Sequence, residues 1–162
     1  MSELTSPTRP LEEAANMSEP IGWKVTSCLI STSQAEVEEE GVAGMRRVDE
    51  PIVNPTWPQV QAFVERLDGK AYTDMAIEGP NRYVMAIGGG PDLFCVSAIG
   101  NDMGPYDLLG PEKTDETGKI ILGGILTDMP RKYFATKEQA LQAAKYFFCH
   151  GGVDPALEWQ LC

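Results

Sequence analysis

The sequence is poor in the residues that most catalytic and metal sites require. It has one histidine, His150, and four cysteines that form no CxxC pair. A Ser-His-Asp or Cys-His mechanism would have to use that single histidine, and a structural zinc site needs more ligands than this spacing brings together. His150 lies at the end of a predicted helix beside Gly151, where a histidine interacts favourably with the helix dipole. We therefore expect no catalytic residue, no metal and no cofactor, and a protein that is not an enzyme.

Basic residues are also scarce. The chain has 13 Lys and Arg against 24 Asp and Glu, and its formal net charge is -11. Such a surface repels nucleic-acid phosphates and anionic membranes, which disfavours direct binding to either. It attracts a basic protein and speeds the encounter with it. The same acidity is typical of a protein that is simply very soluble, so the charge alone leaves a binding role open.

Long apolar runs are missing as well. No stretch approaches the roughly 20 residues of a membrane-spanning helix, and the N-terminus lacks the basic start and apolar core of a signal peptide. Cys28 and Cys95 lie in apolar, strand-like runs and are typical of small buried side chains. We therefore expect a cytoplasmic protein whose cysteines are reduced.

The three consecutive glycines, Gly88 to Gly90, lack the partners of a phosphate-binding loop. A P-loop needs a Lys and a Ser or Thr that lead into a helix, whereas Pro91, Asp92 and an apolar strand follow here. We predict a turn, with a loop that lets a partner approach the backbone as the alternative. Carboxylates are plentiful but lie in turn-rich, solvated stretches, where they make poor general acids. An enzyme with an unrecognised carboxylate site is the remaining catalytic alternative.

The distribution of apolar residues predicts a single α+β domain. Residues 1–20 are rich in Ser, Thr, Pro and Glu and indicate a disordered arm, so that the domain spans residues 21–162. Two helices are marked by their capping residues. The first is expected to begin at Asn54-Pro55-Thr56 and end at Asp68-Gly69, and the second to begin with a capping box of Thr136 and Gln139 and end at Gly151.

The rest of the pattern is typical of β-strands. Alternating apolar residues between turn signals predict a meander of three antiparallel strands, at 71–78, 82–87 and 93–99. Because these strands follow one another without crossover helices, we expect an antiparallel sheet with both helices packed on one face. Trp57 and Trp159 are predicted core residues. Further extended segments are expected at 23–30, 48–53, 119–126 with a bulge or a close backbone approach at Gly123-Gly124, and 131–134.

Residues 100–118 are predicted to form a turn-rich, acidic loop between two strands. The loop mixes carboxylates with aromatic and aliphatic side chains, a composition that suits a protein interface. The alternative is a mobile loop with some side chains folded onto the sheet. The candidate partner-binding residues are Asp102, Met103, Tyr106, Asp107, Leu108, Glu112, Asp115 and Glu116.

Several short segments follow one another in a set order between residues 55 and 160, and the most specific of them is the ending, a helix followed by Gly-Gly, Asp-Pro and Glu-Trp. These segments are Trp57 to Gly69, Gly88-Gly89-Gly90, the strand at 119–126, the helix Ala140 to Phe148, Gly151-Gly152, Asp154-Pro155 and Glu158-Trp159. In this order they resemble the Imm1 family of immunity proteins, which belong to bacterial polymorphic toxin systems.

The resemblance implies a bacterial protein encoded beside a toxin, often one with a nucleic-acid deaminase domain. Such a protein binds the toxin and prevents access to its active site, and it carries no catalytic residues of its own. A deaminase must hold a phosphate backbone, so its cleft is expected to be basic. The expected partner is therefore the basic deaminase domain of a cognate toxin. A non-catalytic regulatory or scaffolding module is the alternative.

Reversing the charges of Asp102, Asp107, Asp115 and Glu116 together is expected to weaken toxin binding. Because the lost attraction is electrostatic, the remaining affinity should also depend less on salt. Titration calorimetry at low and high salt measures both effects. An unchanged affinity would remove this loop from the interface.

Overall fold

An antiparallel sheet runs through the whole domain. In the computed structural model, which describes residues 22–33, 47–49 and 51–162, the spatial order of its strands is β10-β7-β6-β5-β4-β1-β2, and β3 pairs with β1. The predicted arm at 1–20 lies outside the described residues, as does most of the segment between 31 and 50. The strands of this sheet are β1 (Ser27–Ser33), β2 (Arg47–Asp49), β3 (Ile52–Val53), β4 (Tyr72–Glu78), β5 (Val84–Gly89), β6 (Phe94–Gly100), β7 (Met103–Leu108) and β10 (Trp159–Leu161).

The centre of the sheet is the predicted meander of β4, β5 and β6. Side chains along β4 alternate between buried and half-buried, and Thr73, Met75 and Ile77 form the buried set. In β5 and β6 the same alternation points Met85, Ile87 and further apolar side chains toward the core. The alternation of apolar residues at every second position therefore identified both the strands and their buried face.

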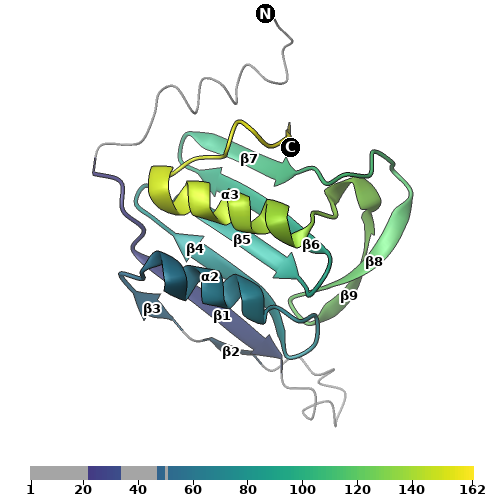
Figure 1. The fold of residues 1–162 in the computed structure, drawn as a ribbon, viewed down its shortest axis with the longest axis horizontal. Coiled ribbons are helices and arrows are strands. Elements are labelled where there is room, and N and C mark those ends of the chain that lie inside the picture. The colour runs from purple at the N-terminus through teal and green to yellow at the C-terminus, as the bar shows by residue number, and fades with distance from the viewer. Residues whose placement is uncertain (1–21, 34–46, 50) are drawn as a thin grey trace, which may run out of the picture.

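Both helices pack on one face of this sheet, which confirms the predicted α+β architecture (Figure 1). Helix α2 (Trp57–Arg66) is capped by Thr56 and Gln59, and helix α3 (Lys137–His150) has the predicted capping box of Thr136 and Gln139. Gly151 ends α3 with φ of 79°, a left-handed conformation that favours glycine.

Trp23 ties the start of the described chain to the end of α3. Its ring lies against Phe147 and Tyr83, with centroids 5.3 and 5.7 Å away, and its Nε1 donates to the carbonyl of Phe148 at 3.0 Å. Trp159 is 5% exposed, as expected for a core residue, whereas Trp57 is half-buried at the rim of the core. The apolar layer between sheet and helices therefore reaches from the first strand to the last.

Four sequence-based expectations about local structure are wrong. Residues 103–108 form strand β7 inside the sheet rather than a loop, and β1 begins at Ser27 rather than at Trp23. Gly123-Gly124 is not a bulge, because both residues have positive φ, 58° and 83°, and form the two-residue turn between β8 (Thr117–Leu122) and β9 (Ile125–Pro130). Residues 131–133 form a short 3-10 helix, η2 (Arg131–Tyr133), where a last strand was expected.

The β8–β9 hairpin is a separate two-stranded sheet that packs against β4 and β5 and forms one side of the molecule (Figure 1). Gly88 and Gly89 make room for it. A Cβ added to Gly88 would lie 2.7 Å from the Leu122 side chain, and one added to Gly89 would lie 2.9 Å from that of Ile120. The predicted turn therefore begins only at Gly90, and the close approach that these glycines permit is made by the chain's own hairpin.

Replacing Gly89 with alanine is expected to lower the free energy of unfolding by about 2 kcal/mol or more. Gly89 has φ of 102°, and an added Cβ would lie 2.5 Å from the carbonyl oxygen of Leu93. Urea unfolding measures the loss. Gly152→Ala is the matched control, because nothing lies within 4 Å of its added Cβ and its φ is ordinary. Equal midpoints for the two variants would contradict this account.

Candidate functional site: a groove on the open face of the sheet

The face of the sheet that carries no helix holds a groove of about 320 Å³. Its floor belongs to β4, β5, β6 and β7, and the hairpin with η2 forms one wall through Leu122, Met129 and Tyr133. The side chains of the floor alternate along each strand with those that point into the core. One face of the strands therefore packs against the helices, and the other face lines the groove.

The floor is made of small side chains. One row across four neighbouring strands reads Ala76, Ala86, Ser97 and Asp107, each directly opposite the next. Gly88 and Cys95 are opposite each other in the adjoining row. Ala86 is exposed, and Ser97 and Asp107 are half-buried, so the hollow comes from short side chains rather than from a gap in the sheet.

Two carboxylates line the groove, Asp74 on β4 and Asp107 on β7. The Asp107 Oδ2 accepts a hydrogen bond from the Cys162 thiol at 2.7 Å, and the backbone N–H of Cys162 donates to Pro105 at 2.9 Å. In the part of the chain that the structure describes, no Lys or Arg forms an ion pair with Asp107, and none lines the groove. Among the described residues, the Asp107 carboxylate therefore lies in the groove without a Lys or Arg as ion-pair partner.

The thiols near Asp107 are poor nucleophiles. Burial, and then the negative charge of Asp107, raise the pKa of Cys95 to about 12. The hydrogen bond to Asp107 is the largest cause that raises the pKa of Cys162 to about 11. Cys28 is fully buried in the core, and burial raises its pKa to about 11. At neutral pH these three cysteines are thiols rather than thiolates, which argues against thiolate chemistry in the groove.

The eight predicted partner-binding residues do not form one surface. Met103, Tyr106 and Leu108 are core residues that are at most 6% exposed, so their place in the predicted interface is a correction that follows from β7 being a strand. Asp102 lies before β7 in the β6–β7 turn and accepts a hydrogen bond from Tyr83. That bond, after burial, helps to raise the pKa of Tyr83 to about 12. Of the eight, only Asp107 lines the groove.

The three remaining predicted residues follow β7, in a loop that is fastened to the rest of the domain. Glu112 forms a long ion pair with Arg131 at 4.0 Å, and Asp115 accepts from Lys132 at 2.8 Å, which raises the pKa of the Lys132 amine. Glu116 is exposed, and its carbonyl accepts from the backbone of Arg131. Cations of the chain itself therefore already compensate part of this acidic charge.

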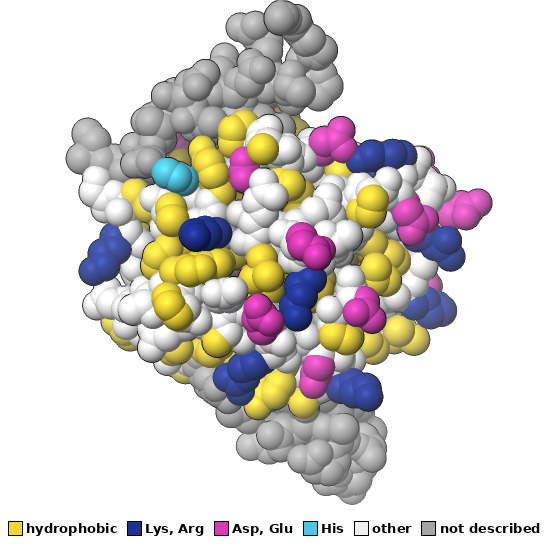
Figure 2. Space-filling model, in the orientation of Figure 1, with side chains coloured by type: hydrophobic (Ala, Val, Ile, Leu, Met, Phe, Trp, Pro, Cys, Tyr) yellow, Lys and Arg dark blue, Asp and Glu magenta, His cyan; other side chains and the backbone are white. Residues whose placement is uncertain are grey.

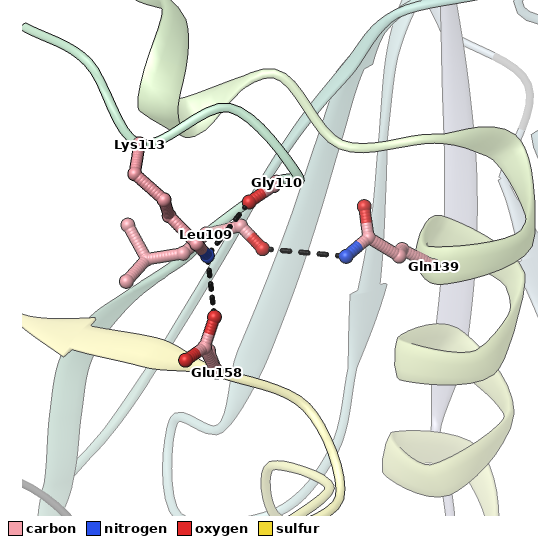
Figure 3. A network of polar contacts seen from close by, with 5 residues as sticks. All are labelled: Leu109, Gly110, Lys113, Gln139 and Glu158. Carbon is pink, nitrogen blue, oxygen red and sulfur yellow. Dashed lines mark hydrogen bonds and ion pairs between the residues drawn. The ribbon is translucent and has the colours of Figure 1, made fainter.

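A second network fixes the beginning of the same loop (Figure 3). The Lys113 amine donates to the carbonyl of Gly110 at 3.0 Å and to the carboxylate of Glu158, just before β10. On the other side, the Gln139 amide of α3 donates to the carbonyl of Leu109 at 3.4 Å. The segment thus has polar contacts with both the sheet edge and a helix.

The helix face differs from the groove. Figure 2 shows Lys and Arg interspersed with Asp and Glu on that face, with hydrophobic side chains exposed between them. A shallow hollow there includes Cys149, His150 and Asp154. Cys149 and His150 are neighbours on a helix and do not face each other, and the Asp154 carboxylate accepts from Gln142 and from the backbone N–H of Ala156. The His150 ring lies against that of Tyr146 at the end of α3, with centroids 4.6 Å apart and the ring planes tilted by 44°.

The groove carboxylates are badly placed for acid–base catalysis on one bond. Two strands lie between β4 and β7, and Asp74 is two residues from Ala76, the β4 residue in the row of Asp107, so about 16 Å separates the two backbone positions. The paired carboxylates of glycoside hydrolases, for comparison, lie roughly 5 to 10 Å apart. Among the described residues, no group of three or more His, Cys, Asp or Glu could hold a metal ion.

No helix in the described part is long and apolar enough to cross a membrane.

The sequence reasoning missed the groove residues Asp74, Cys95 and Ser97. A signal for them was present, because the central alternate positions of the meander strands are small or polar: Asp74, Ala76, Ala86, Gly88, Cys95 and Ser97. Solvent-facing strand positions more often carry long polar side chains, so a patch of short ones indicates a surface that admits another molecule.

Comparison with known proteins finds no family model and no curated protein that matches the chain. The resemblance to the Imm1 family therefore stays a prediction that rests on the short segments named above.

Asp107→Ala is expected to speed alkylation of Cys162 by iodoacetamide at pH 8 by about tenfold or more. The carboxylate stabilises the protonated thiol, so its removal lowers the pKa of Cys162 from about 11 and raises the thiolate fraction. Mass spectrometry of quenched time points gives the rate for each cysteine. Cys149 is also exposed and serves as the internal control. If Cys162 reacts at the wild-type rate, Asp107 does not hold its proton.

Proposed function

We propose that this chain is an immunity protein that binds a cognate bacterial toxin and neutralises it by covering its active site or substrate cleft. The expected target is a nucleic-acid deaminase domain. The observation that carries the proposal is the groove on the open sheet face, which combines a small-residue floor with an uncompensated carboxylate. Such a surface is suited to protein recognition, and the resemblance supplies the class of partner.

The hairpin beside the groove supports a protein-binding role. Ile125 and Leu126 follow its Gly-Gly turn and are 56% and 59% exposed. Two adjacent aliphatic side chains at the tip of a ribbon are costly to keep in water, and an interface would bury them. Ile125 is directly opposite the wall residue Leu122, so these two give the open face an apolar rim, whereas Leu126 is opposite Ile121 on the other face of the hairpin.

The charge of the chain agrees with a basic target. Residues 1–21, 34–46 and 50 hold nine of the 24 acidic residues and two of the 13 basic ones, and so contribute -7 of the net charge of -11. The described body is therefore only mildly acidic, and Asp107 in the groove is one of its carboxylates without an ion pair to Lys or Arg. A deaminase cleft that holds a phosphate backbone presents the complementary sign.

Co-expression tests the proposal directly. The toxin domain encoded by the neighbouring gene is expected to arrest growth when induced alone, and this chain is expected to restore growth by forming a stable complex with it. Colony counts and co-purification with a catalytically inactive toxin variant measure protection and binding separately. The matched control replaces this chain with an equally acidic, unrelated protein of similar size. Arrest that persists despite full expression of this chain would refute the proposed function.

A further inference from the structure

We infer that the groove receives an extended, basic segment of the partner, with a Lys or Arg side chain against Asp107. The identity of that partner as a toxin rests on the proposed function. The chemistry of the occupant rests on the groove alone, whose floor, wall and charge each restrict what fits.

The floor admits a main chain at close range. Ala76 and Ala86 are directly opposite each other on β4 and β5, and Ser97 and Asp107 continue the row on β6 and β7. Short side chains at successive positions let an extended segment lie across the strands. About 10 Å separates Ala86 from Asp107 at the backbone, since neighbouring strands are about 4.8 Å apart. A long side chain from a segment above Ala86 therefore reaches the carboxylate.

The charge of the groove selects a cation. Asp107 is half-buried, and the contact that the structure records for its carboxylate is the Cys162 thiol, a weak donor. An ion pair formed in a partly desolvated groove is stronger than one on an open surface, because screening by water and salt is weaker. A guanidinium or ammonium group would supply both the hydrogen bond and the charge that the described lining lacks.

The wall suits the aliphatic part of such a side chain. Leu122 and Met129 of the hairpin and Tyr133 of η2 face the floor across the groove. The methylene stem of Lys or Arg packs on apolar surface while its charged end reaches a carboxylate, and methionine adapts to occupants of different shape. A nucleic-acid strand is disfavoured here, because its phosphates would lie beside the Asp107 carboxylate.

Two pairs of variants test the inference with the inactive toxin domain as the probe. Ala86→Leu fills the floor, and Ala62→Leu makes the same change at an exposed position of α2 in the helix layer. Asp107→Asn removes the groove charge, and Glu138→Gln removes one exposed charge from α3. Thermal unfolding first establishes that all four variants are folded.

The groove variants are expected to bind about tenfold or more weaker than wild type, and the two helix-layer variants are expected to bind as wild type does. Asp107→Asn should also lose part of the salt dependence. Wild-type affinity for both folded groove variants would place the interface elsewhere and overturn the inference, while the proposed function would stand.

A peptide array separates the inference from the identity of the partner. Heptapeptides with Lys or Arg at each position, flanked by small or apolar residues, are expected to bind the wild-type chain, and Asp107→Asn should lose that preference. If this result appears although no toxin is neutralised, the groove inference holds and the proposed function fails. If neither the array nor the toxin depends on Ala86 and Asp107, the groove inference fails.

Discussion

The pair of backbone hydrogen bonds between Phe94 and Ala135 determines how the helix layer and the hairpin are joined. The two N–H groups and two carbonyls are 2.7 and 3.0 Å apart, at the point where β7 has left the side of β6. Ala135 takes the place that the next residues of β7 would occupy. Thr136 caps α3 immediately afterwards, and η2 and the hairpin precede it. One short bridge therefore fixes both the start of the helix and the base of the groove wall.

Glycines allow two close approaches, one of the segment after β7 to the bridge segment and one of the hairpin to the sheet. A Cβ on Gly110 would lie 1.7 Å from the carbonyl oxygen of Phe134, so no other residue lets the segment after β7 pass the bridge segment at this distance. Gly88 and Gly89 likewise let Leu122 and Ile120 rest on the sheet. The wall stands close to the floor only because these side chains are absent. The groove is thus a consequence of how the chain crosses itself.

Short-range sequence patterns predicted the elements that form through interactions between residues near one another in the sequence. The alternation along β4 and the two capping boxes are short-range features, and they identified the meander, both helices and the face they cover. The prediction failed at β7, because Gly104 and Pro105 resemble a turn and the register shift between β6 and β7 puts Met103 and Tyr106 out of step. It also missed the groove, whose residues come from four strands and meet only through sheet pairing.

Two electrostatic roles can be distinguished at Asp107: the long-range attraction of basic proteins and the selection of one of them. The net charge of the sequence does not distinguish these roles. Net charge acts over distances up to about a Debye length, roughly 8 Å in physiological salt, and it accelerates encounter with any basic protein. Most of that charge lies outside the described body, and the exposed carboxylates Glu112 and Asp115 already have cations of the chain itself as partners. In the interface that we infer, the half-buried Asp107 carboxylate discriminates instead, because only a segment that fits the floor of the groove can bring its cation there. Affinity for basic proteins in general and selection of one of them are therefore properties of different residues.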